Sequence, residues 1–331
     1  MLAGPTVMAD RKDQDMIEAR GLTKRYGDTL AVDNLSFTVE PGRITGFLGP
    51  NGAGKTTTMR LILGLDRPTS GTVTVDGKPF SRLAWPMREV GALLDAKAVH
   101  GGRSAYNHLL CVAQTNNLPK RRIEEVLELV GLSEVARKRS KGFSLGMGQR
   151  LGIASALLGD PKILMFDEPV NGLDPEGILW IRNLMKALAS EGRTVFVSSH
   201  LMSEMENTAD HLIVIGRGKL ISDCTTSEFI AANSQQSVRV RTPQREELAA
   251  LASAAGATVR DDAGGALVLL GLTATQVGDL AFENGIRLHE LAAAHASLEQ
   301  AFMELTASSV EFHAGLPGGA ARESAHAGEV A

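Results

Sequence analysis

Short apolar runs alternate with longer segments of helical spacing along most of this chain. Residues 32–39 (VDNLSFTV) alternate loosely between apolar and polar positions, and residues 44–48 are a second apolar run after a Pro-Gly turn, so both are predicted to be strands. A glycine-rich loop and a helix over about 55–63 follow. Later strands are predicted over 163–166, 194–198, 212–215 and 219–222, with helices over 177–190 and about 201–207. Such alternation favours a mainly parallel sheet with helices on its faces.

Two segments interrupt this alternation. Residues 72–75, followed by Asp76-Gly77, are predicted to form half of a β-hairpin. The middle of the chain, about residues 88–160, has mostly helical spacing, which is clearest over 103–117 and 121–130. We therefore expect a helical subdomain there, before the strand at 163–166.

The pattern changes after residue 229. Strands are predicted over 237–241, on both sides of Gly264-Gly265 and over 287–291, with helices over 244–255, 274–284 and about 297–306. The order β-α-β-β-α-β is typical of a small ferredoxin-like unit, which we expect to span residues 236–307. Residues 1–16 are predicted to be disordered, and the Ala/Gly-rich residues 313–331 to be a flexible tail.

The composition is that of a globular protein without membrane-spanning segments. Of the 331 residues, 44% are hydrophobic, and the net charge is -4; because nucleic-acid binders usually have a basic excess, no nucleic-acid partner is expected. No apolar run is long enough to span a bilayer, and residues 1–16 lack the apolar core of a signal peptide. Cys111 and Cys224 stand far apart in the sequence, which favours free thiols in a cytoplasmic protein.

Residues 49–56 (GPNGAGKT) match the phosphate-loop pattern G-x-x-x-x-G-K-[ST]. Glycine lets backbone N–H groups turn toward phosphate oxygens, and the following helix directs its positive end at the same point. Lys55 supplies a cation for the β- and γ-phosphates, and the Thr56 hydroxyl can bind Mg²⁺. The other residues predicted to contact the nucleotide are Gly49, Pro50, Asn51, Gly52, Ala53, Gly54 and Thr57.

Residues 163–169 (ILMFDEP) form an apolar run that ends in two acids. The carboxyl ends of buried parallel strands are where open α/β sheets bind ligands, so Asp167 is predicted to hold Mg²⁺. Glu168 is then placed to orient or deprotonate the attacking water. Beside a phosphate loop, these roles are favoured over a strand that merely ends in solvated acids.

The segment 141–161 (KGFSLGMGQRLGIASALLGDP) is predicted to be a helix with an unusual glycine content. Ser144 is a natural N-cap, yet Gly146, Gly148 and Gly152 follow it. Each glycine inside a helix costs about 1 kcal/mol relative to alanine. A glycine-rich helix start leaves backbone N–H groups open to an anion. Because the phosphate loop already supplies one such site, a second one makes sense if two chains share each nucleotide.

At these residues the chain resembles the ATP-binding subunits of ABC transporters, over about residues 17–229. GPNGAGKTTT (residues 49–58) is similar to the Walker A motif, and ILMFDEP is similar to the Walker B motif with its catalytic glutamate. FSLGMGQR (143–150) resembles the signature motif, NGLDP (171–175) the D-loop, and VSSH (197–200) the switch-histidine motif. The order of these motifs along the chain is that of the family.

The resemblance implies an α/β fold and a shared nucleotide site. An ABC-type P-loop ATPase domain over residues 17–230 would have a mainly parallel sheet core, an antiparallel β subdomain and a helical subdomain, followed by a small α+β C-terminal domain. ATP and Mg²⁺ would bind between two chains of a homodimer. The resemblance assigns adenine stacking to Tyr26, a γ-phosphate contact to His200, a position facing the partner chain to Asp174, and closure over the partner's ATP to Ser144, Leu145, Gly146 and Met147. A lone tyrosine such as Tyr26 is more often part of packing.

Two positions depart from the family pattern. Asp95 stands near the place of the Q-loop glutamine, where an acid could still hold water on Mg²⁺ but adds negative charge beside the phosphates. In the signature, Leu145 and Met147 replace a glycine and a glutamine, whereas Ser144 and Gly146 remain. The replacements could change how tightly two chains close on ATP.

Three segments resemble most the daunorubicin-resistance-type efflux ATPases: FSLGMGQRLGIA, VSSHLMSEMENTAD and HASLEQAFMELT. In that subfamily the ATPase is a separate chain that pairs with separately encoded integral membrane transporter subunits. The resemblance therefore implies a peripheral subunit at the cytoplasmic face of the membrane, which powers export of a drug, an antibiotic or a lipid-like compound.

Two other functions fit parts of the sequence. A soluble ABC-type ATPase acting on translation or DNA would commonly carry two cassettes or a long coiled coil, and this chain has a single phosphate loop and no heptad run. A small-molecule kinase or GTPase would leave the signature and His200 motifs unexplained. The basic residues 137–141 (RKRSK) are either a solvated face or a contact with lipid headgroups or a membrane subunit.

Overall fold

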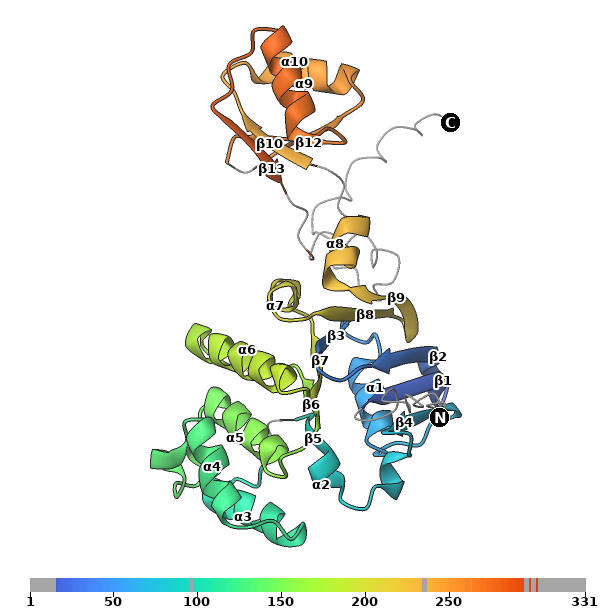
Figure 1. Ribbon diagram of the computed structural model, residues 1–331, viewed down its shortest axis with the longest axis vertical. Coiled ribbons are helices and arrows are strands. Elements are labelled where there is room, and N and C mark those ends of the chain that lie inside the picture. Colours follow the sequence, from blue (N-terminus) through green and yellow to red (C-terminus); the bar gives the residue numbers. More distant parts are fainter. Residues whose placement is uncertain are drawn as a thin grey trace, which may run out of the picture.

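The computed structural model describes residues 16–95, 98–233, 237–262, 264–294, 298 and 302, which form three β-sheets and the helices around them (Figure 1). Apart from Met16, the two terminal segments predicted to be disordered or flexible lie outside the described residues. Within the described part of the chain, no helix has both the length and the apolar character needed to cross a lipid bilayer.

The largest sheet has the strand order β5-β6-β7-β3-β8-β9. Neighbouring strands from β5 to β8 are parallel and only β9 is antiparallel, which confirms the predicted mainly parallel sheet. Every residue of β3 and β6 is buried, as expected for strands covered on both faces. The strands are β3 (Ile44–Leu48), β5 (Val90–Leu93), β6 (Ile163–Asp167), β7 (Thr194–Ser199), β8 (His211–Gly216) and β9 (Lys219–Thr225).

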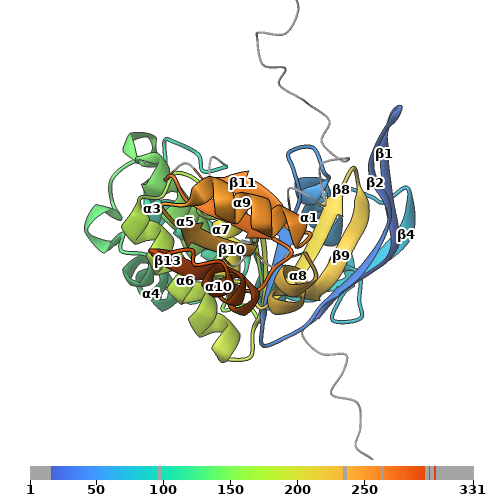
Figure 2. The same cartoon turned by 90° about the horizontal axis from the view of Figure 1, so that it is seen from above.

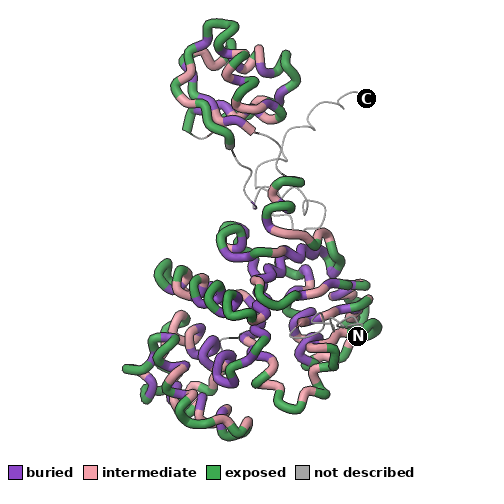
Figure 3. The backbone as a smooth tube through the Cα atoms, in the orientation of Figure 1, coloured by how far each residue is buried: buried purple, intermediate pink, exposed green. Residues whose placement is uncertain are grey.

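Alternate residues of these strands belong to two hydrophobic clusters. Phe47, Met165 and Phe196 belong to the cluster that contains α1 (Lys55–Ile62) and the antiparallel sheet, and the rings of Phe47 and Phe196 lie 5.1 Å apart. Phe166 belongs to the second cluster. Figure 1 shows the helices of that cluster on the other side of the sheet from α1, and Figure 3 shows buried positions in purple on both sides. The helices of that second cluster are α3 (Ala105–Thr115), α4 (Arg121–Leu129), α5 (Leu145–Leu157), α6 (Pro175–Ser190), α7 (Met202–Glu206) and α8 (Thr226–Asn233).

A three-stranded antiparallel sheet of order β2-β1-β4 covers α1. Its strands are β1 (Ile17–Tyr26), β2 (Thr29–Val39) and β4 (Ser70–Val75). The prediction that 72–75 forms half of a hairpin holds for a short hairpin: Val75 and Lys78 exchange both backbone hydrogen bonds across the Asp76-Gly77 turn. The rest of β4 pairs with β1 instead. Polar residues and the register shift near Gly21 interrupt the alternation of apolar and polar positions in β1. The sequence pattern therefore did not predict this strand.

The middle region, predicted to be mostly helical over about residues 88–160, is helical except near its start, where a strand that the sequence did not predict falls within that range. After α2 (Pro86–Glu89), residues 90–93 form β5 and pair with β6 in the large sheet. This apolar run is too short for its spacing to distinguish strand from helix. A Cβ atom on Gly91 would lie 2.1 Å from the Ala156 oxygen of α5, so the close contact between strand and helix requires glycine. Short 3₁₀ helices lie at Phe80–Arg82, Ser133–Val135 and Ser140–Gly142.

Residues 237–294 form a smaller α+β unit with its own hydrophobic cluster. Its antiparallel sheet has the order β11-β12-β10-β13, and both helices lie on one face of it (Figures 1 and 2). The last strand begins three residues later than the predicted start at 287, at Glu290. The elements are β10 (Ser237–Arg241), α9 (Arg245–Ala254), β11 (Thr258–Asp261), β12 (Leu267–Leu270), α10 (Ala274–Glu283) and β13 (Glu290–Ala294).

The chain contacts the large domain again after the small one. Leu298 and Phe302 are helical and buried, and they belong to the cluster that contains Met202 and Phe229 rather than to the small domain's cluster. The Leu298 N–H donates a hydrogen bond of 3.1 Å to the carboxylate of Glu206, at the end of α7. The expected boundary of the small domain at residue 307 is therefore wrong, because an apolar helix pattern does not show which core it joins.

This contact predicts that Leu298→Ala will destabilise the large domain by about 2–5 kcal/mol, because the side chain is fully buried. Both tryptophans, Trp85 and Trp180, lie in the large domain, so their fluorescence during urea unfolding reports on that domain alone. As a control, Leu291→Ala in β13 should leave the tryptophan transition unchanged. An unchanged midpoint for Leu298→Ala would contradict the contact.

Candidate active site

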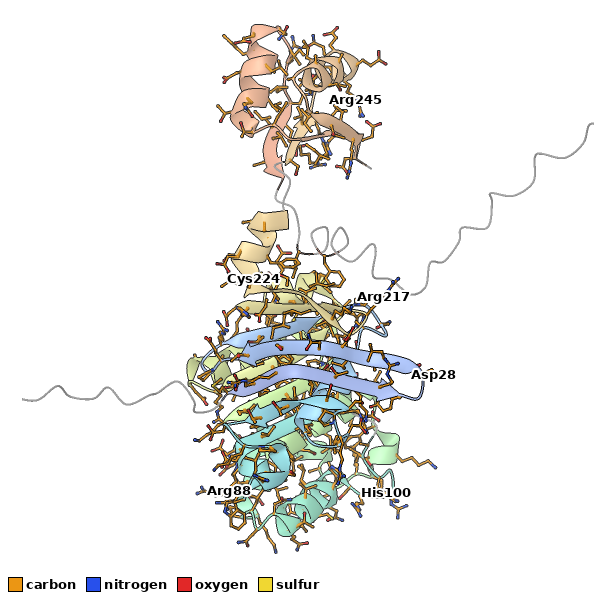
Figure 4. All side chains as sticks on the ribbon, turned by 90° about the vertical axis from the view of Figure 1, so that its right-hand side faces the viewer. Asp28, Arg88, His100, Arg217, Cys224 and Arg245 are labelled. Carbon is orange, nitrogen blue, oxygen red and sulfur yellow. The ribbon has the colours of Figure 1, made fainter. Side chains whose placement is uncertain are left out.

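The loop between β3 and α1 is tightly enclosed by backbone. Gly52 and Gly54 have φ values of 83° and 103°, in the left-handed region that favours glycine. A Cβ atom on Gly54 would lie 2.5 Å from the Ala31 oxygen, and one on Gly49 would lie 2.6 Å from the Ile215 oxygen. The loop therefore packs between the start of β2 and the end of β8; Figure 4 labels Asp28 and Arg217 in the turns at these two strands.

The start of α1 is left open to an anion. Its N-cap is Gly54, which offers no capping side chain, and its first turn contains no acid. A cavity of about 250 Å³ lies beside it and is lined by Ala31, residues 50–57, Asp167 and Glu168. The structure thus brings the loop and both acids of the β6 end to one cavity.

Lys55 is held inside the loop. Its side chain is buried, and its ammonium group donates hydrogen bonds to the carbonyl oxygens of Gly49 (2.7 Å) and Pro50 (3.3 Å). Burial lowers the pKa of Lys55, while the nearby charges of Glu168 and Asp167 act to raise it. The ammonium group lies 3.9 Å from a carboxylate oxygen of Glu168, so the cation lies between the loop and the acids.

Thr56 and Asp167 meet across the cavity wall although they stand far apart in the sequence. The Thr56 hydroxyl donates a 2.6 Å hydrogen bond to Oδ2 of Asp167. Hydroxyl and carboxylate oxygens are the ligands that Mg²⁺ prefers, with the remaining positions filled by phosphate and water. Within the described residues no three His, Cys, Asp or Glu side chains cluster as a metal site. Thr56 and Asp167 fit the kind of Mg²⁺ site that phosphate and water complete.

Glu168 and His200 contact each other directly. The Nδ1 atom of His200 lies 2.7 Å from Oε2 of Glu168, and the His200 backbone N–H donates to the same oxygen at 3.4 Å. The histidine side chain is 42% exposed and the glutamate side chain 19% exposed, so water can reach both. A carboxylate paired with an imidazole at the end of the cavity can accept a proton from water.

Glu168 has a backbone conformation that neighbouring residues must support. Its φ is 51°, which is uncommon for a residue with a side chain. The Ser198 hydroxyl accepts the Glu168 N–H at 3.1 Å. From α5, the Gln149 side chain donates to the carbonyl oxygens of Glu168 (3.2 Å) and Pro169 (2.9 Å). Neither Ser198 nor Gln149 was predicted as a site residue, and the only signal was their position inside two motifs.

Two glycines of the segment 141–161, Gly146 and Gly152, lie close to other parts of the same chain. The Ser144 hydroxyl caps α5 by accepting the Met147 N–H at 3.2 Å. A Cβ atom on Gly146 would lie 3.0 Å from the Gly172 oxygen, and one on Gly152 would lie 2.5 Å from the Leu93 side chain. Glycine here therefore serves close packing within the chain, in addition to any role toward a partner's nucleotide. Ser144 and Leu145 are exposed, and they line a second cavity that shares no residue with the first.

Three other predicted site residues lie outside the phosphate cavity. The Tyr26 hydroxyl donates to Asp66 at 2.8 Å, and the Lys24 ammonium group lies 4.7 Å from the centre of its ring. Asp95 is exposed just beyond the end of β5 and does not line the cavity. Asp174 is the N-cap of α6 and accepts the Gly177 N–H at 2.9 Å.

Together these features define a class of protein, the P-loop ATPases. A glycine-rich loop leads from the parallel strand β3 into an open helix N-terminus, and β6 of the same sheet ends in Asp167, which accepts a hydrogen bond from Thr56 and is followed by a second acid.

Comparison with known proteins places the chain within this class. The family model described as "ABC transporter" matches residues 32–171, and a domain of unknown function matches residues 236–299. The uncharacterized ABC transporter ATP-binding protein YhcH of Bacillus subtilis is 37% identical over 89% of this chain and 97% of its own length. The bacitracin transport ATP-binding protein BcrA of Bacillus licheniformis is 45% identical over 63% of this chain and 69% of its own length.

Solved structures agree with the fold. A dimeric ATP-binding cassette in a post-hydrolysis state, bound to ADP and Pi, has a TM-score of 0.58 at 23% identity, and the match covers 63% of this chain and 98% of that one. The chain belongs to the ABC transporter family as an ATP-binding protein, and it is an ATPase whose hydrolysis is coupled to transport. The P-loop ATPase fold expected from the sequence is thereby confirmed.

The Gln149 contacts predict that Gln149→Ala will lower the free energy of unfolding by about 1–3 kcal/mol, because a buried and a partly buried carbonyl oxygen lose their donor. Urea unfolding followed by tryptophan fluorescence measures this change. Ser155→Ala is the control, since the Ser155 hydroxyl donates to the Leu151 carbonyl oxygen within the same helix, at 3.0 Å. Equal stabilities for the two variants would contradict a supporting role for Gln149.

Proposed function

We propose that this chain is the ATP-hydrolysing subunit of an exporter that removes an antibiotic through separately encoded membrane subunits. The observation that carries the ATPase part is the cavity lined by the phosphate loop, the Thr56–Asp167 pair and Glu168, whose carboxylate contacts His200. Similarity to a bacitracin transport ATP-binding protein supports the antibiotic as cargo. The alternative, a soluble ABC-type ATPase acting on translation or DNA, has no comparable support.

In the proposed site, this chain's residues bind and orient the nucleotide. The loop N–H groups and Lys55 bind the phosphates, and Tyr26 stacks on adenine. Thr56 and Asp167 hold Mg²⁺, which neutralises phosphate charge. Glu168 accepts a proton from the attacking water at its carboxylate, and His200 steadies that carboxylate and contacts the γ-phosphate.

We propose that two chains share each nucleotide. Within one chain, Ser144 lines a cavity that shares no lining residue with the phosphate cavity, which fits a signature that contacts the ATP of a second copy. The fold match to a dimeric cassette supports this arrangement. Ser144 to Met147 of one chain would then close over the phosphates held by the other, with Asp174 near the interface. The region around Asp95 would transmit the opening of the dimer to the membrane subunits.

The proposed location is the cytoplasmic face of the membrane, as a peripheral subunit. The exposed residues Arg137, Lys138, Arg139 and Lys141 lie on the helical side of the domain, before α5. Their positive charge would suit contact with anionic headgroups or with a membrane subunit.

For Glu168→Gln we expect ATP binding and ATP-dependent dimerisation to persist while turnover falls by about 10²–10⁴-fold, because the carboxylate that accepts the proton is gone. Phosphate release and size-exclusion chromatography with ATP measure these properties. Glu176→Gln, in the exposed first turn of α6, is the control. Full turnover by Glu168→Gln would exclude the proposed role of Glu168.

For Ser144→Arg we expect normal ATP binding to the monomer, loss of the ATP-dependent dimer and loss of turnover, because a long cation replaces the small N-cap that meets the partner's phosphates. Lys141→Arg, a nearby exposed basic position, should leave both properties unchanged. Normal turnover by Ser144→Arg would mean that this stretch serves only packing within the chain.

The transport role is tested by checking whether an adjacent gene encodes a multi-span membrane protein and by expressing both proteins in a bacitracin-sensitive strain. Resistance that requires both proteins and is lost with Glu168→Gln supports the proposal. Purification of the tagged chain from detergent-solubilised membranes should bring down an integral membrane protein. Ribosomes or DNA in its place would favour the soluble alternative.

A further inference from the structure

Ser198 lies at the centre of the hydrogen bonds that hold the two acids of the site. It is fully buried near the end of β7, and in the parallel register it stands directly opposite Asp167 of β6. Its hydroxyl donates to Oδ1 of Asp167 and accepts the N–H of Glu168 at 3.1 Å. Its backbone carbonyl also accepts that N–H, at 3.3 Å.

These directions are fixed by the number of protons available. A serine hydroxyl has one proton and two lone pairs, and a carboxylate can only accept, so the proton must point to Asp167. The lone pairs are then free for the Glu168 N–H. One hydroxyl therefore links the metal-binding acid with the residue next to it, whose φ of 51° needs support.

The two oxygens of Asp167 have different donors. Oδ2 accepts from Thr56, which is itself expected to hold the metal, whereas Oδ1 accepts from Ser198, which lies behind the site in the sheet. The Thr56 hydroxyl is itself expected to bind the metal, so its hydrogen bond to Asp167 competes with metal binding. The hydrogen bond from Ser198 to Asp167 does not. Ser198 can thus keep the carboxylate oriented with Oδ2 toward the cavity.

We propose that Ser198 is a positioning residue for the metal site: its hydroxyl orients Asp167 for Mg²⁺ and holds the backbone of Glu168. The proposal rests on the role of Asp167 in the proposed function. Groups that orient metal ligands typically change metal affinity by about 10–100-fold when removed.

The test compares binding of the non-hydrolysable analogue AMP-PNP to the full chain, in EDTA and in excess Mg²⁺, by isothermal titration calorimetry. The dissociation constant in EDTA divided by that in Mg²⁺ measures how much the metal strengthens binding. For Ser198→Ala we expect this ratio to fall about ten-fold or more. Binding in EDTA should stay within about two-fold of the wild type, because the loop N–H groups and Lys55 are unchanged.

Ser199→Ala is the matched control. Ser199 is the next residue and equally buried, but its hydroxyl accepts the Leu201 N–H at 2.9 Å and does not touch Asp167. Its ratio should equal that of the wild type. Ser198→Thr, which keeps the hydroxyl, should restore the ratio, and direct Mn²⁺ titration in the presence of AMP-PNP, followed by electron paramagnetic resonance, should rank the variants in the same order.

The other possible results of this experiment would overturn the positioning role of Ser198, each for a different reason. Equal ratios for Ser198→Ala and the wild type overturn the positioning role but leave the ATPase site intact. An equal loss of binding in EDTA and in Mg²⁺ overturns it in favour of a general folding role. A wild type without any Mg²⁺ enhancement overturns the proposed metal role of Asp167 as well. If Ser198→Ala does not fold, Ser198→Cys replaces it in the test. The cysteine retains the volume, but its thiol is a weak hydrogen-bond donor, so a wild-type ratio in that variant counts against the proposal.

Discussion

The in-register parallel alignment of β6, β7 and β3 is the constraint on which the site depends. Asp167 stands opposite Ser198, and Ser199 stands opposite Leu48, so the three strands end along one edge of the sheet. Parallel strands buried on both faces cannot slip without placing polar residues in either core. The loop after β3 and the acids after β6 therefore meet in one cavity, and Thr56 reaches Asp167.

Charge is balanced at this edge. Lys55 lies between the loop oxygens and Glu168, and Glu168 in turn contacts His200. Burial would make an unpaired ammonium costly, which is why it is surrounded by carbonyl and carboxylate oxygens. A nucleotide's phosphates would exchange one set of oxygens around Lys55 for another, and a divalent cation would offset the repulsion between those phosphates and the two acids.

The segment after His200 connects the site to the end of the chain. Helix α7 begins two residues after His200, and its last residue, Glu206, accepts the N–H of Leu298. Because Leu298 and Phe302 are buried in the large domain's cluster, the small domain lies between two contacts of the chain with that domain. This connectivity explains how a domain with a separate core is tied to the ATPase domain at both ends.

The sequence alone determined that β3, β6 and β7 are strands and identified the phosphate loop, because buried parallel strands and glycine-rich loops leave local patterns such as ILMFDEP and GPNGAGKT. It could not show β1 or β5, whose short or polar runs become strands only through their partners. The supporting roles of Ser198 and Gln149 likewise depend on contacts between distant segments. Local spacing records which face of an element is apolar, but only the tertiary structure decides which polar atoms meet across the sheet.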